Sequence, residues 1–393
     1  MTSNQTLYRD TWAEINLDAI AHNVHTIQHH IGPYKKIMAV VKANAYGHGA
    51  VAVAQAALLA GATHLGVATL DEAIMLRTQF IDAPILVLGY APPKHATVAA
   101  SHHIILTVVS TRHAEQLASF MKNASGIQLN VHLKIDSGMS RLGIRNAKEL
   151  MQAVTFLSNT PSIQLTGAFT HFAESDADHL NFTYEQLQLT NQLFELLKQH
   201  VTEIDGLLFH AANSGGILQV PESHYDMVRL GISLYGVYPS HHLRKNKPLS
   251  LIQALKLKSR IALLKEVPSE TPISYGSTFV TNHPMRIATI PIGYGDGIPR
   301  ILSNRGYFLL QGVRCAILGR ICMDQTIIDV SDFDNVQEGD EVIIYNEQTL
   351  PELSDLSGTI PYELLCAIAP RVPRLYDTSQ SHRILVDPGI QLI

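Results

Sequence analysis

Residues 39–49 read Ala-Val-Val-Lys-Ala-Asn-Ala-Tyr-Gly-His-Gly, and Lys42 stands at the end of the apolar part of this run. An unpaired ammonium group is costly to bury inside a strand. A lysine at a strand tip, before a glycine-punctuated loop, can instead reach a pocket where desolvation favours the neutral amine that forms Schiff bases. A lysine that simply leaves the strand for solvent fits this run equally well.

Short apolar runs typical of buried strands alternate with longer segments of helical spacing over the first ~240 residues. Eight strands are predicted, at 37–41, 64–68, 85–88, 104–109, 127–135, 163–169, 206–209 and 227–230. Helices are predicted at 18–31, 50–62, 71–80, 112–122, 147–157 and 184–200. Eight strand–helix units predict an α/β fold, a (β/α)8 barrel of the TIM type, with an open doubly wound sheet as the competing layout.

The pattern changes after Pro239. Residues 240–250 are polar and basic, and we predict that they form a linker. Beyond them, turn signals separate β-like segments at 255–264, 285–291, 307–310, 313–318, 325–330 and 341–345, and a short helix is predicted at 361–368. We therefore predict a barrel domain over residues 1–245 and a mainly-β domain over 246–393, with the first ~10 residues as candidates for pairing with the β domain.

Composition and charge exclude several classes of function. The chain has 393 residues and a net charge of −5, so it lacks the basic footprint of a nucleic-acid-binding protein. Residues 1–16 contain no apolar signal core, and the most apolar helix, 50–62, is too short to span a bilayer. Cys315, Cys322 and Cys366 show no metal-ligand spacing. We expect a cytoplasmic protein with no metal, no nucleic-acid partner and no membrane span.

Polar residues gather where the predicted strands end, which is the catalytic face of a parallel barrel. Two lysines, two histidines and an arginine fall there: Lys42, Lys134, His171, His210 and Arg229. Their mutual repulsion requires an anionic ligand, and the small, glycine-flanked residues after the last two strands suit a phosphate. A strand-end lysine beside a phosphate site favours pyridoxal phosphate among the common cofactors.

Three other motifs indicate no further cofactor. The run 293–297, Gly-Tyr-Gly-Asp-Gly, hints at a dinucleotide loop, but Pro299 and a β-like segment follow it where a helix is required. The run 47–49 is too short for a P-loop. The histidine pairs at 102–103 and 241–242 lack the spacing and acidic partners of a zinc site.

Taken in chain order, the motifs resemble those of alanine racemases, pyridoxal-phosphate enzymes whose eight-stranded barrel precedes a β domain. The resemblance extends over about residues 11–386. The runs that carry it stand at 39–49, 132–143, 170–173, 210–214, 228–232, 274–276, 292–300, 319–325 and 362–365.

The resemblance implies two bases that serve opposite faces of an amino-acid substrate, because one base reaches only one face of Cα. Lys42 would hold the cofactor through a Schiff base and act as one base. Tyr275, from the other subunit of a head-to-tail homodimer with shared active sites, would be the second. His171 would hydrogen-bond Tyr275 and Arg229, with His210 close behind, and Arg229 would face the pyridine nitrogen.

The resemblance also implies a set of binding residues. Arg141 would contact the cofactor's phenolic oxygen and the substrate carboxylate, and Met323 of the partner subunit would offer its backbone amide to that carboxylate. Lys134 matches a position that can be carbamylated, where it would help to orient Arg141. The cofactor and its phosphate would also be held by Tyr46, Asn213, Ser214, Gly231, Ile232 and Tyr362.

The implied activity is the interconversion of L-alanine and D-alanine, with D-alanine supplied for peptidoglycan. A serine or broad-specificity racemase is the main alternative, because pocket size cannot be read from sequence. A basic amino-acid decarboxylase usually presents an acid to the ring nitrogen, which Arg229 opposes, and the binding-only pyridoxal-phosphate homeostasis proteins lack a β domain. Gly295, Phe279 and the run 174–176 depart from the family pattern without removing a proposed catalytic group.

Overall fold

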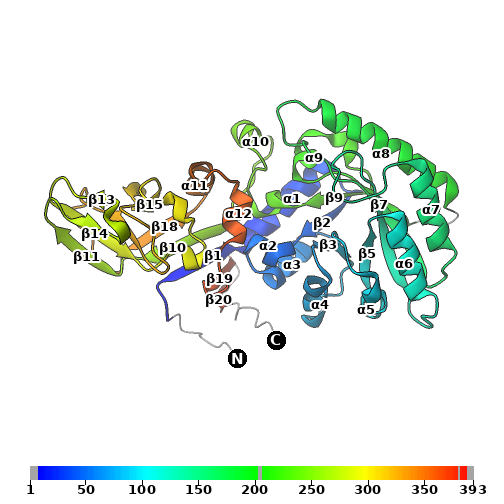
Figure 1. Ribbon diagram of the computed structural model, residues 1–393, viewed down its shortest axis with the longest axis horizontal. Coiled ribbons are helices and arrows are strands. Elements are labelled where there is room, and N and C mark those ends of the chain that lie inside the picture. The colour runs from blue at the N-terminus through cyan, green and yellow to red at the C-terminus, as the bar shows by residue number, and fades with distance from the viewer. Residues whose placement is uncertain (1–7, 202–205, 379–380, 387–393) are drawn as a thin grey trace. The chain divides into compact units, whose positions relative to one another are not determined.

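The computed structural model describes residues 8–201, 206–378 and 381–386 (Figure 1). Most of the first ten residues, which we considered for pairing with the β domain, therefore lie outside the described part. The chain divides into two compact units, a barrel unit of residues 19–45 and 50–252 and a β unit of residues 1–18, 46–49 and 253–393. Within the described residues, no helix is long and apolar enough to cross a membrane.

The barrel unit is built on eight parallel strands that run in the order β8-β7-β6-β5-β4-β3-β2-β9. They are β2 (Lys36–Val40), β3 (His64–Val67), β4 (Ile85–Val87), β5 (Ile104–Val108), β6 (Leu129–Lys134), β7 (Ile163–Phe169), β8 (Leu208–His210) and β9 (Met227–Leu230). The end strands approach each other, since Asp226 N–H donates to Phe209 O at 3.1 Å and Arg229 N–H to Ala212 O at 3.0 Å. The predicted α/β barrel is confirmed, and an open doubly wound sheet is excluded.

Helices connect the strands and cover the outside of this sheet (Figure 1). They include α1 (Leu17–Ile31), α3 (Ala50–Leu59), α4 (Leu70–Thr78), α5 (Ala96–Ser101), α6 (Thr111–Met121), α7 (Ala147–Ser158), α8 (Asn181–His200) and α9 (Ser214–Gln219). Inside the sheet, side chains from five strands form one apolar cluster: Met38, Leu86, Ile105, Phe169 and Met227. Fully buried parallel strands read as continuous apolar runs, which is why all eight were found from sequence.

The predicted linker at 240–250 is partly wrong, because residues His241–Asn246 form helix α10. Ser240 caps this helix and donates its hydroxyl to Asp176 O at 2.6 Å. Farther along, Asn23 holds Ile252 with two hydrogen bonds, accepting from its N–H at 2.9 Å and donating to its carbonyl at 2.8 Å. The segment is thus tied to the barrel unit by contacts between residues distant in sequence.

The β unit contains a seven-stranded sheet in the order β16-β15-β18-β10-β1-β19-β20, a three-stranded sheet β11-β14-β17 and a hairpin β12-β13. The strands are β1 (Thr11–Asn16), β10 (Leu255–Arg260), β11 (Leu263–Val267), β12 (Pro272–Ile273), β13 (Phe279–Val280), β14 (Met285–Ile290), β15 (Tyr307–Leu310), β16 (Val313–Ala316), β17 (Thr326–Asp329), β18 (Glu341–Tyr345), β19 (Arg374–Thr378) and β20 (Ser381–Val386). Two helices accompany them, α11 (Thr349–Ser357) and α12 (Pro361–Cys366).

One predicted β segment, 255–264, is in fact two strands. The chain turns at Ile261 and Ala262, so that β10 pairs with β1 and β18 while β11 pairs with β14 in another sheet. Sequence analysis also missed β1, which lies between β10 and β19. Its partners lie more than two hundred residues away, and such pairing leaves no local signature.

Candidate active site

Lys42 lies two residues after the end of β2 and opens a turn of unusual conformation, labelled α2 (Lys42–Tyr46) in Figure 1. The next four residues are all left-handed, with φ between 50° and 52° for Ala43, Asn44, Ala45 and Tyr46. Residues with a Cβ lose roughly 1–2 kcal/mol each in this conformation, so left-handed turns without glycine are rare. Strain of this kind persists only where the surrounding structure holds it.

Four basic side chains act electrostatically on His171. Burial is the largest cause of its pKa lying well below the usual value, and the charges of Arg229, Lys134, Arg141 and Lys42 lower that pKa further. The pKa of Lys134 is also far below its usual value, through burial first and then the charges of Arg229 and Arg141. The ends of several strands thus bring the predicted cationic residues of the barrel together.

Arg229 is buried among these residues, and its guanidinium group makes five hydrogen bonds with residues that follow β7 and end or follow β8. Its Nη2 donates to Thr170 O (2.7 Å), Ala211 O (2.8 Å) and His171 Nδ1 (3.1 Å). Its Nη1 donates to His210 Nδ1 at 3.0 Å and to His210 O at 3.2 Å. Burial lowers the pKa of Arg229 to about 9, which still leaves the guanidinium protonated at neutral pH.

Phe169, at the end of β7, provides an apolar ring that contacts Lys134, Arg229 and His210. The Lys134 ammonium nitrogen lies 4.6 Å from the centroid of its ring, and the Arg229 guanidinium carbon lies 5.3 Å from it. The His210 ring stacks on it with centroids 4.8 Å apart and an angle of 5° between the planes. Such contacts stabilise cations that have lost their water.

The hydrogen bonds of Arg229 also determine the protonation of a buried histidine chain. A guanidinium only donates, so Nδ1 of both His171 and His210 must accept, and each ring carries its proton on Nε2. His210 Nε2–H then donates to His132 Nδ1 at 3.0 Å. His132 Nε2 carries the last proton and has no hydrogen-bond partner among the described residues. Sequence analysis gave His132 no role.

A glycine on the neighbouring strand makes room for His132. Gly167 is the ladder partner of His132, and a Cβ at Gly167 would lie only 2.7 Å from His132 Nε2. A polar residue within a predicted apolar strand, opposite a glycine, is the signal that could have pointed to this histidine.

These buried histidines should make folding stability depend on pH. Burial lowers the pKa of His132 to about 3 and that of His64, on β3, to about 4. The unfolded chain, with histidine pKa values near 6.5, binds more protons below that pH, so stability is fully present above pH ~6.5 and declines as pH falls toward 4. Two such residues contribute a slope of roughly 3 kcal/mol per pH unit.

Urea denaturation at fixed protein concentration, from about pH 8 down to pH 5, measures this slope. We expect His132→Asn to flatten the profile, whereas His283→Asn, at an exposed position, should leave it unchanged. A profile for His132→Asn that parallels the parent protein would contradict the assignment.

The loop that carries Arg141 is ordered by Asp136. One oxygen of this carboxylate accepts from the backbone N–H groups of Gly138 (3.1 Å) and Ser140 (2.9 Å). Ser140 has φ 58°, the left-handed conformation needed to turn the chain just before Arg141. Asp136 lies within the motif at 132–143, and its hydrogen bonds explain why this loop carries an acid two residues after Lys134.

A cluster of small polar groups forms after β8 and β9. The Ser214 hydroxyl oxygen accepts from the backbone N–H groups of Gly231 (3.2 Å) and Ser233 (3.3 Å), so the two predicted phosphate-binding segments meet. Asn213 caps α9 by accepting from Gly216 N–H at 3.0 Å. A Cβ at residue 215 would lie 2.8 Å from Ser175, so only glycine fits. Backbone and hydroxyl donors beside cationic residues suit a phosphate group.

The remaining predicted residues belong to the β unit. The rings of Tyr46 and Tyr362 lie 6.0 Å apart. Tyr275 and Met323 are 70% and 52% exposed. Within the described residues, no hydrogen bond engages the Tyr275 hydroxyl or the Met323 backbone N–H. Groups with these properties are available to another molecule.

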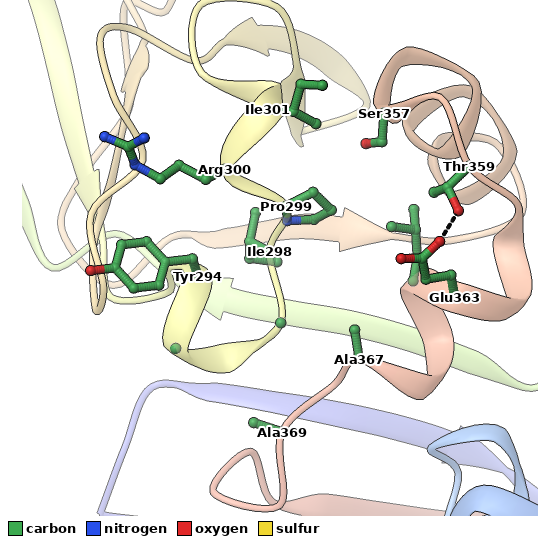
Figure 2. A pocket seen from close by; sticks show the side chains of 13 residues that line it. Tyr294, Ile298, Pro299, Arg300, Ile301, Ser357, Thr359, Glu363, Ala367 and Ala369 are labelled. Carbon is green, nitrogen blue, oxygen red and sulfur yellow. Dashed lines mark hydrogen bonds between the residues drawn. The ribbon is translucent and has the colours of Figure 1, made fainter.

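The β unit also contains a cavity of about 610 Å³, shown in Figure 2. Tyr294 and Arg300 belong to one stretch of the lining, and Ser357, Thr359 and Glu363 belong to another, where the Thr359 hydroxyl donates to the Glu363 carboxylate. None of the predicted catalytic groups lines this cavity.

The strand-end residues fit pyridoxal phosphate. A phosphate has hydroxyl and amide donors after β8 and β9, and a lysine stands at the end of β2. The buried Arg229 supplies a cation, and Phe169 provides an apolar surface. No group of three or more His, Cys, Asp or Glu in the described residues could hold a metal ion.

Comparisons with known proteins agree with this arrangement. Residues 15–239 match the alanine racemase N-terminal domain, and residues 254–376 match the C-terminal domain. The chain is 46% identical over 377 residues to alanine racemase 2 of Oceanobacillus iheyensis, with 94% of each chain covered. It superposes on the crystal structure of alanine racemase from Bacillus anthracis, which has L-Ala-P bound, with a TM-score of 0.91 and 38% identity, covering 97% of this chain and 98% of that one. A histidine racemase from Leuconostoc mesenteroides matches with a TM-score of 0.84 and 30% identity, covering 95% and 99%. The chain belongs to the alanine racemase family.

Proposed function

We propose that this protein interconverts L-alanine and D-alanine and supplies D-alanine for peptidoglycan, acting as a cytoplasmic homodimer with shared active sites. The observation that carries the proposal is the cluster of Lys42, Lys134, Arg141 and Arg229 around His171 at the strand ends. Family membership supports the racemase class. The β domain of one subunit, by this proposal, contributes Tyr275 and Met323 to the active site of the other.

Pyridoxal phosphate, held through Lys42, supplies an electron sink that makes the Cα proton of the bound amino acid removable. Lys42, once its amine is free, would act as the base on one face of Cα. Its place just after β2 puts it near His171, on which Lys134, Arg141 and Arg229 also act.

Tyr275 of the partner subunit is proposed to serve the opposite face. Arg229 donates to His171 Nδ1, so His171 carries its proton on Nε2. That N–H can donate a hydrogen bond to the Tyr275 oxygen and so orient it. The exposure of Tyr275 and its lack of a hydroxyl partner among the described residues support a role toward a second subunit.

Arg229 is proposed to face the pyridine nitrogen. Its Nη1 and Nη2 are occupied by five hydrogen bonds, which makes Nε the natural donor to the ring. Because the guanidinium keeps its proton at neutral pH, it would donate a hydrogen bond to the ring nitrogen without transferring a proton to it. Such an arrangement would limit delocalisation into the ring, would suit proton return at Cα, and disfavours the decarboxylase alternative.

Arg141 is proposed to bind the substrate carboxylate and the cofactor's phenolic oxygen, with help from the backbone amide of Met323 in the partner subunit. Lys134 lies among cations and its lowered pKa favours a neutral amine, which can add carbon dioxide and release a proton to give a carbamate. That negative group would offset the charges of Arg229 and Arg141. The phosphate would be held by Tyr46, Asn213, Ser214, Gly231, Ile232 and Tyr362.

Substrate specificity separates an alanine racemase from related racemases, since a histidine racemase shares the fold. Purified protein loaded with pyridoxal phosphate is incubated with L-alanine, L-serine, L-histidine or L-lysine, and the enantiomers are resolved. We expect alanine to have the highest kcat/KM. A higher value for serine or histidine would favour a broader racemase, and release of carbon dioxide would favour a decarboxylase.

A further inference from the structure

The left-handed turn after Lys42 is held from outside by a residue on another element. Ala43 N–H donates to Glu72 Oε1 at 2.7 Å, across 29 positions of sequence. Ala43 is the residue directly after the lysine, so this bond acts where the strained turn begins. Glu72 lies in the first turn of α4, which follows the neighbouring strand β3.

The other oxygen of the same carboxylate holds the end of β3. Glu72 Oε2 accepts from Ala68 N–H at 2.7 Å and from Thr69 N–H at 3.3 Å. Thr69 in turn caps α4 by accepting from Glu72 N–H at 3.3 Å. A capping box needs only the Thr69–Glu72 pair. The capping box does not need the hydrogen bonds from Ala68 and Ala43 to Glu72. Together these two bonds connect the C-terminal ends of the adjacent strands β3 and β2.

The turn itself has further supports. Ala45 N–H donates to Val41 O at 2.9 Å, and the Asn44 side-chain oxygen accepts from Ala50 N–H at 2.8 Å. Neither of these two hydrogen bonds involves the backbone N–H of Ala43, which is the amide that follows Lys42. Glu72 is therefore the group that fixes the first peptide of the turn.

We propose that Glu72 is a positioning residue for Lys42, whose carboxylate locks the left-handed turn and so directs the lysine from β2. The proposal rests on the proposed function, because it takes Lys42 as the cofactor-bearing base. Such a base must reach both the cofactor and Cα, and a small displacement of its backbone lowers the rate without altering substrate affinity.

The test compares Glu72→Ala with Thr69→Ala. The second substitution removes the helix cap but leaves the Glu72 carboxylate in contact with Ala43. Amide hydrogen exchange of the 42–46 segment is measured in the full-length enzyme stripped of pyridoxal phosphate. We expect exchange at Ala43 to accelerate on the order of tenfold to a hundredfold in Glu72→Ala, because a hydrogen bond to a charged acceptor is lost. Thr69→Ala should exchange at Ala43 like the parent.

Reconstitution then tests positioning. We expect Glu72→Ala to incorporate pyridoxal phosphate more slowly, followed by its absorbance, and to lose roughly tenfold in kcat with KM for alanine little changed. Unchanged Ala43 exchange, or an equal loss in Thr69→Ala, would overturn the proposal. A parent protein that takes up no cofactor would instead refute the proposed function, while the exchange comparison would remain valid for the turn.

Discussion

Replacing Lys42 with alanine is expected to reduce racemisation by at least ~10⁴-fold, because one side chain is asked both to hold the cofactor and to move a proton. The loss should appear in both directions, from L-alanine and from D-alanine. Added methylamine should restore part of the activity if the missing group is an amine. The measurement is kcat in each direction with pyridoxal phosphate in excess.

Lys134 is the alternative to Lys42 as the lysine that bears the cofactor. Its pKa is lowered by burial and by Arg229 and Arg141, so it too can present a neutral amine. Borohydride reduction of the loaded enzyme followed by peptide mapping decides between the two. The label should fall on the peptide containing Lys42 and persist in Lys134→Arg, and a label on Lys134 would overturn the assignment.

The barrel could be predicted from sequence because its strands are buried on both faces. Runs such as 104–109 are nearly continuous in apolar residues, and segments of helical spacing lie between most of the predicted strands. The β unit was less predictable. The bend at Ile261 and Ala262 and the insertion of β1 between β10 and β19 depend on partners far along the chain.

The candidate site also contains residues that could be predicted from sequence and residues that could not. Lys42, Lys134, His171 and Arg229 could be predicted because parallel strands end at one mouth, and the structure brings their charges together. Thr69 and Glu72 form a helix cap in the structure, and nothing local in the sequence indicates that Glu72 also contacts Ala43. His132 was overlooked because a histidine inside an apolar strand most often belongs to the core.

Tyr275→Phe removes one oxygen and is expected to slow racemisation on the order of a thousandfold, the range of general acid–base contributions. The remaining base still serves one face of Cα. In deuterated water, exchange of the α-hydrogen should therefore persist for one enantiomer of alanine and nearly vanish for the other. Equal exchange of both enantiomers would contradict the assignment of opposite faces.

Mixing the two inactive variants tests whether the site is shared between subunits. In a heterodimer of Lys42→Ala and Tyr275→Phe chains, a shared arrangement gives one site with both substitutions and one site with both native residues. Random re-association makes half the dimers mixed, so about a quarter of the parent activity should return. If Lys42 and Tyr275 of the same chain formed the site, every site would lack one base and no activity would return. Recovery therefore establishes that Tyr275 acts across the dimer, and its absence after verified subunit exchange refutes it.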